Sequence, residues 1–101
     1  MSHSRTVELI HLDDCPHWRQ AAARVGEAMR VAGLDPMSVR YRSVATEGAP
    51  ADFPGSPTIL IDGRDPFPNA VPAGPTCRRY PTAQGPDVAP TLDQLVESLA
   101  D

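Results

Sequence analysis

Two stretches of the chain carry apolar residues at helical spacing. Between Pro16 and Ala32 the apolar positions lie three and four residues apart on one helix face, at Trp18, Ala22, Val25, Met29 and Ala32. The stretch from Thr91 to Ala100 repeats this spacing and begins with a possible capping box of Thr91 and Gln94. The pattern therefore predicts a long helix over 16–32 and a terminal helix over 91–100.

The long helix has clear start and stop signals. Cys15 stands at the expected N-cap, and Pro16 occupies the first helical position, where its missing N–H costs nothing. Gly33 can supply a left-handed C-terminal cap, with Leu34 as the apolar residue behind it. These signals place Cys15 at the N-terminus of the predicted helix.

Four short runs predict β-strands. The run 6–12 is largely apolar and typical of a strand buried on both faces, whereas 38–44 alternates like a half-exposed strand. The run 57–61 is short and apolar, and the tight-turn signal Asp62-Gly63 follows it. We expect 77–80 to form the second strand of a widened hairpin with 57–61, across a long loop over 64–76.

The order of these elements predicts the fold class. The first two strands flank the long helix, which favours a right-handed crossover and a parallel pair. A short helix within 45–53, capped by Thr46, is expected next. The order β-α-β-α-β-β-α then predicts a single α/β domain over residues 1–101, with a four-stranded mixed sheet and flanking helices.

Composition and charge exclude several classes of function. The chain has 9 basic and 13 acidic residues and no basic run longer than Arg78-Arg79, so we expect no nucleic-acid partner. No apolar run approaches the roughly 20 residues of a membrane span. The N-terminus shows no apolar signal region. We expect a cytoplasmic protein with no membrane partner, whose two cysteines are thiols.

The element order and two motifs resemble the thioredoxin superfamily. Cys15-Pro16-His17 begins the first helix, and Gly55-Ser56-Pro57-Thr58 precedes the third strand. The resemblance covers residues 5–100 and implies a thioredoxin-like fold. It also implies that Pro57 follows a cis peptide bond and lies against the cysteine.

A narrower resemblance is to a small thioredoxin-like branch that has Cys-Pro-x-Trp in place of Cys-x-x-Cys. Its motifs correspond here to the ranges 15–18, 55–58, 62–67 and 77–80. Trp18 stands where the related disulfide oxidases have their resolving cysteine. The branch has no settled activity, so it indicates the fold and leaves the reaction open.

The resemblance implies a role for each residue of the motifs. Cys15 would be the nucleophile, His17 would tune its pKa, and Pro57 would orient an incoming disulfide. Substrate would be bound by Pro16, Trp18, Ser56 and Thr58. No bound cofactor is implied.

The residues themselves leave the reactivity of Cys15 open. The helix N-terminus and a protonated His17 would lower the pKa of the thiol, while Asp13 and Asp14 would raise it. The alternative is a cap cysteine retained in an inactive site. Trp18 begins the inner helix face, so we expect a core aromatic rather than a substrate platform.

The absence of a cysteine at position 18 constrains the mechanism. Cys-x-x-Trp cannot close a local disulfide, so a mixed disulfide at Cys15 needs glutathione, a partner protein or Cys77 to resolve it. A Cys15–Cys77 bridge needs Cα atoms within ~7 Å, and the expected hairpin holds Cys77 away from the helix. Otherwise Cys77 is a small buried apolar residue.

The leading hypothesis is a single-thiol thioredoxin-like protein with a thiol–disulfide or glutathione-linked redox role. The main alternative is a non-catalytic thioredoxin-like module that binds a partner protein in the same groove. A weak soft-metal binder, taking mercury or copper through Cys15 and His17, ranks third. No spacing in the sequence matches a zinc site, so no metal ligands are predicted.

Overall fold

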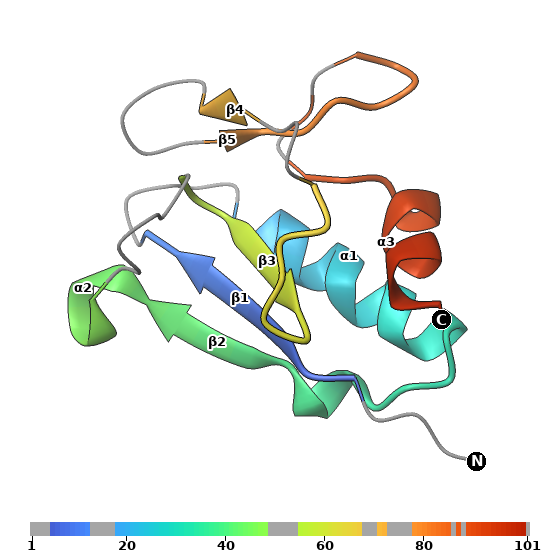
Figure 1. Cartoon of the computed structure of the whole chain (residues 1–101), viewed down its shortest axis with the longest axis horizontal. Coiled ribbons are helices and arrows are strands. Elements are labelled where there is room, and N and C mark those ends of the chain that lie inside the picture. The colour runs from blue at the N-terminus through green and yellow to red at the C-terminus, as the bar shows by residue number, and fades with distance from the viewer. Residues whose placement is uncertain are drawn as a thin grey trace.

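Three strands form a mixed sheet in the order β2-β1-β3 (Figure 1). The computed structural model describes residues 5–12, 18–48, 55–67, 71–72, 78–85, 87 and 89–100. The central strand β1 (Val7–His11) runs parallel to β2 (Arg40–Ser43) and antiparallel to β3 (Thr58–Ile61). The structure therefore confirms the first three predicted strands and the parallel pairing of the first two.

Two helices cover one face of this sheet. The long helix α1 (Trp18–Val31) packs against the terminal helix α3 (Leu92–Leu99), and Figure 1 shows them side by side. Their buried side chains join those of β1 and β3 in one core, which includes Leu9, Val25, Met29, Ile59 and Leu95. Successive strand residues face opposite ways, so Ile10, which is 0% exposed, lies on the other face.

The predicted helix ends are confirmed where the structure describes them. Gly33 has a φ of 80°, and the N–H of Leu34 donates to the carbonyl of Met29 at 2.8 Å, as in a Schellman cap. At α3 the side chain of Thr91 accepts from Gln94 N–H, and the side chain of Gln94 accepts from Thr91 N–H. A 3₁₀ helix over Pro36–Ser38, capped by Asp35, then joins α1 to β2.

The predicted fourth strand of the sheet is wrong. Within the described part of the chain, the strand β5 (Arg78–Arg79) pairs with β4 (Val71–Pro72) in a separate two-stranded sheet and not with β3. The tight turn at Asp62-Gly63 forms as predicted, but only a single bridge between Ile61 and Arg64 follows it. The prolines beyond Arg64 lack the N–H that a longer ladder needs. The loop predicted over 64–76 therefore also contains β4.

The predicted cap of the short helix is also wrong. The helix α2 (Val44–Glu47) follows β2 directly, with Ser43 and not Thr46 in the N-cap position. Gly48, with a φ of 80°, ends it and donates its N–H to the carbonyl of Val44. A helix that began after Thr46 would have no room for a turn before this glycine. None of the helices in the described ranges is long and apolar enough to cross a membrane.

Replacement by alanine should have opposite effects on stability at Gly26, which lies within α1, and at Gly33, which caps its C-terminal end. Gly26→Ala should stabilise the fold by about 0.5–1 kcal/mol, because alanine is the better helix residue and its Cβ would meet only Pro36 Cβ at 4.0 Å. Gly33→Ala should destabilise it by about 1 kcal/mol, because an L residue is disfavoured at a φ of 80°. Urea unfolding of both variants measures this. Shifts of the same sign would contradict the assigned helix end.

Candidate functional site

The structure describes the frame around the predicted thiol site but not the thiol itself. The described chain stops at Leu12, after β1, and resumes at Trp18, the first residue of α1. Cys15, Pro16 and His17 lie outside the described residues, and so does Cys77. The site is therefore built here from the residues that flank it in the chain and from the loop before β3.

The loop before β3 is tied to the end of β1. The backbone N–H of Leu12 donates to Ser56 Oγ at 3.0 Å. Thr58 Oγ1 donates to the carbonyl of Gly55 at 2.5 Å, which closes the loop on itself. Ser56, Pro57 and Thr58 are all buried, and the Ser56–Pro57 peptide bond is cis, as the resemblance implied. The structure thus holds three of the predicted site residues beside Leu12, the last described residue before Cys15 in the sequence.

Tyr80 holds this loop from the other side. Its hydroxyl donates to the carbonyl of Pro57, and the whole side chain is 0% exposed. The ring of Phe67 meets the ring of Tyr80 edge-on, with centroids 5.5 Å apart. A buried carbonyl needs a donor, so Tyr80 is the residue that allows Pro57 to be buried.

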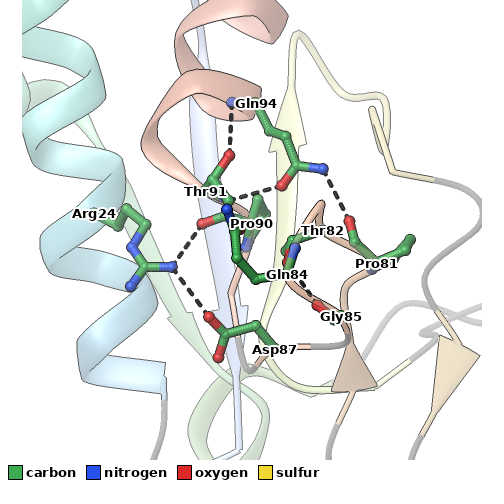
Figure 2. A network of polar contacts seen from close by, with 9 residues as sticks. All are labelled: Arg24, Pro81, Thr82, Gln84, Gly85, Asp87, Pro90, Thr91 and Gln94. Carbon is green, nitrogen blue, oxygen red and sulfur yellow. Dashed lines mark hydrogen bonds and ion pairs between the residues drawn. The ribbon is translucent and has the colours of Figure 1, made fainter.

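A polar network fixes the segment that carries Tyr80 (Figure 2). Tyr80 and Asp87 exchange backbone hydrogen bonds of 2.8 and 3.0 Å. Arg24 on α1 donates to the carbonyl of Pro90 at 2.9 Å and lies 3.7 Å from an Asp87 carboxylate oxygen. Gln94 on α3 donates to the carbonyl of Pro81 at 2.9 Å. Both helices therefore anchor the segment that supports the Pro57 loop.

Trp18 lies at the end of β1 and is only partly buried. Its ring stacks on that of His11, with centroids 3.8 Å apart and planes 10° apart. It also contacts the edge of the core, so the expected core packing is present, but the residue keeps an accessible surface. Tyr41 on β2, which is 45% exposed, lies 6.4 Å from it between centroids.

Sequence reasoning missed several residues at this site. One of them is Arg19, whose guanidinium carbon lies 5.0 Å from the Trp18 ring centroid. The stack of His11 on Trp18 depends on where β1 ends relative to α1. The contact of Tyr80 with Pro57 spans 23 residues. The alternation that puts Tyr41 on the same sheet face as Leu9 and His11 was the one usable signal.

A hollow lies at the other end of β3, away from the Pro57 loop. Its volume is about 510 Å³, and its lining includes Arg5, Asp62, Arg64 and Ser98. The backbone N–H of Thr6 and the guanidinium of Arg5 hold the pKa of Asp62 below its ordinary value of 3.8. Asp62 thereby fixes the start of β1 to the turn after β3, which gives this end a structural role.

Neither a metal-binding cluster nor a similarity to known proteins indicates what this site does. In the part of the chain that the structure describes, no group of three His, Cys, Asp or Glu residues is arranged to hold a metal ion. No protein-family model matches the chain, and neither a curated protein nor a solved structure matches it significantly. The thioredoxin-like assignment therefore stays a prediction.

Tyr80→Phe should destabilise the fold by about 1–3 kcal/mol, because it leaves the buried carbonyl of Pro57 without its donor. Tyr41→Phe is the matched control. Its hydroxyl belongs to an exposed side chain, so we expect a change within about 0.5 kcal/mol. Chemical unfolding of the two variants compares them directly. Equal losses would refute the proposed support of the Pro57 loop.

Asp62→Asn should weaken the fold most at neutral pH. The folded-state pKa of Asp62 is lowered, so its carboxylate stabilises the fold above the unfolded-state pKa. That stabilisation is lost as the pH falls through the folded-state pKa. The urea midpoints of wild type and variant should therefore converge in acid, since asparagine tolerates the positive φ at this position. A difference that did not change with pH would contradict the assignment.

Proposed function

We propose that this chain is a thioredoxin-like domain in which Cys15 exchanges with disulfides as a single thiol. The observation that carries the proposal is the hydrogen bond from Leu12 N–H to Ser56 Oγ. It joins the residue that leads into the Cys15 segment to the residue before Pro57. The β2-β1-β3 order, with α1 and α3 on one face, supports the same fold.

Chain connectivity limits where the thiol can lie. Cys15 is three residues from Leu12 and three from Trp18, and three extended residues span at most about 11 Å. Leu12 is hydrogen-bonded beside Pro57, and Trp18 stacks on the last residue of β1. The chain from Leu12 is thus long enough for Cys15 to reach the Pro57 loop, which supports a site there.

The proposed reaction is thiol–disulfide exchange in two steps. The Cys15 thiolate attacks one sulfur of a disulfide, forms a mixed disulfide and releases the other sulfur as a thiolate. A second thiol, such as glutathione, then attacks the mixed disulfide, takes the bound group and returns Cys15 as a thiolate. The second thiol must be glutathione, a thiol of a partner protein or Cys77, because Trp18 stands in the position of a local resolving cysteine.

One observation favours a second candidate function. Trp18 is stacked on His11 and packed at the edge of the core, so the fold uses this position for structure. A domain that keeps the frame without a resolving thiol can serve as a non-catalytic module that binds a partner protein. The two candidates differ in the pKa and reactivity of Cys15.

Alkylation of Cys15 should proceed with an apparent pKa clearly below the ~8.5 of a free thiol, because a helix N-terminus stabilises the thiolate. The rate is measured against pH in Cys77→Ser, which leaves Cys15 as the only thiol. The same variant should reduce a glutathione mixed disulfide when glutathione is supplied. Cys15→Ser, which keeps Cys77, should not.

The contrary results are equally specific. An alkylation pKa at or above that of a free thiol would remove the exchange function. Equal rates of mixed-disulfide reduction by the Cys15→Ser and Cys77→Ser variants would do the same and leave the binding module. Intact mass after mild oxidation of wild type reports any Cys15–Cys77 bridge.

A further inference from the structure

We propose that the Asp62–Gly63 bond is a site of spontaneous isomerisation to isoaspartate, against which Arg5 and Thr6 protect the folded chain. The turn that holds this bond follows β3, at the end of the strand that lies away from the Pro57 loop. The inference concerns a modification of the chain itself and does not depend on the proposed reaction of Cys15.

The sequence singles out Asp62 for this chemistry. It is the only aspartate of the chain that a glycine follows. The backbone nitrogen of a glycine is the least hindered nucleophile for the reaction, because glycine has no side chain to shield it. A proline, which follows Asp65, has no N–H with which to react. We therefore expect isomerisation first at Asp62–Gly63.

The reaction needs no reagent other than water. The backbone nitrogen of Gly63 attacks the side-chain carboxyl carbon of Asp62, so that a C–N bond forms and the C–OH bond breaks. The nitrogen loses its proton and the carboxyl group loses its hydroxyl, which together leave as one water molecule. Water then opens the resulting succinimide at either carbonyl and gives aspartate or isoaspartate.

The turn leaves the attacking nitrogen accessible. Gly63 is exposed and has a φ of 80°, and a Cβ added to it would meet nothing within 4 Å. The hydrogen bond that closes the turn runs from Arg64 N–H to the carbonyl of Ile61 at 3.1 Å and does not involve the nitrogen of Gly63. Neither crowding nor this hydrogen bond protects the nitrogen, so protection has to act on the carboxyl group.

The start of β1 holds both oxygens of the Asp62 carboxylate. Oδ1 accepts the backbone N–H of Thr6 at 2.9 Å, and Oδ2 accepts the guanidinium of Arg5 at 2.5 Å. The N–H of Asp62 in turn donates to the carbonyl of Thr6 at 2.7 Å. We call these three hydrogen bonds the carboxylate clamp. They hold the side chain in one orientation, so attack in the folded chain requires the clamp to open.

The clamp also keeps the carboxyl group in its unreactive form. The hydrogen bonds from Thr6 and Arg5 hold the pKa of Asp62 below its ordinary value of 3.8. The hydroxyl leaves only from a protonated carboxyl group, so a carboxylate resists the ring closure. Orientation and ionisation therefore act in the same direction.

Isomerisation would undo the same contacts. Isoaspartate has one more backbone atom than aspartate, and its free carboxylate is attached to Cα. The turn would lengthen, and the carboxylate would no longer stand where Thr6 and Arg5 bind it. The single bridge between Ile61 and Arg64 lies in this turn and would be lost with it.

The test is the rate at which isoaspartate appears at position 62 during incubation at mildly acidic pH. A protein isoaspartyl methyltransferase measures the amount, and peptide mass spectrometry locates it. We expect isoaspartate to accumulate in wild type unfolded in guanidinium chloride. Folded wild type should form it at least about tenfold more slowly, because local opening of an ordered turn costs free energy.

Variants separate the clamp from the stability of the whole fold. Arg5→Gln should raise the rate in the folded protein about three- to fivefold, as expected for the loss of one partly exposed ion pair. Arg40→Gln is the matched control, because Arg40 also pairs with carboxylates but lies on β2. Gly33→Ala lowers the stability of the fold without touching the clamp. Neither control should change the rate.

Three results would overturn the inference. One is an unfolded chain that forms no isoaspartate at position 62, and another is equal rates in folded and unfolded wild type. The third is a rise in either control as large as that in Arg5→Gln. All of these measurements can be made in Cys15→Ser, so they stand or fall independently of the thiol chemistry.

Discussion

Burial of β1 on both faces of the sheet is the constraint on which the rest of the structure depends. Leu9 faces the helices and Ile10 faces the other side, and both are 0% exposed. A strand buried in this way must have its backbone groups paired on both edges, and β2 and β3 supply that pairing. This pairing fixes the register of β2 and β3 against β1. It also fixes the position at which β1 ends and the chain continues toward α1.

Segments that are distant in sequence meet at that point. Leu12 reaches Ser56, Tyr80 reaches Pro57, and Arg24 reaches the segment that holds Tyr80. The Tyr80–Pro57 contact is buried and the other two are partly buried. Loss of the buried contact would leave the carbonyl of Pro57 unpaired. The candidate site is therefore supported from the sheet, from α1 and from the C-terminal region at once.

The sequence predicted most of the regular fold because its signals are local. The 3.6-residue spacing of Trp18, Val25 and Met29, the cap at Gly33 and the box of Thr91 with Gln94 each lie within one element. The predicted strand pairing with β3 failed because it depended on the packing of a distant segment. The predicted cap at Thr46 failed for a local reason, since Gly48 leaves no room for a helical turn after that residue. Proline-rich sequence after Arg64 ended the ladder, and β2 ran directly into α2.

Some features of the candidate site were likewise predictable from local sequence and others were not. The cis bond at Pro57 followed from a motif, whereas the contact of Tyr80 with Pro57 depends on tertiary packing that no local pattern encodes. Trp18 shows both effects. Its place on the apolar helix face was readable, but its stack on His11 required the end of β1 to lie beside the start of α1.

The most direct test of the proposed site is a nuclear Overhauser experiment between the β-protons of Cys15 and the ring protons of Pro57. If the thiol lies against the Pro57 loop, a cross-peak between them is expected in the reduced protein. Cross-peaks from Cys15 to other parts of the molecule, with none to Pro57, would contradict the proposed site.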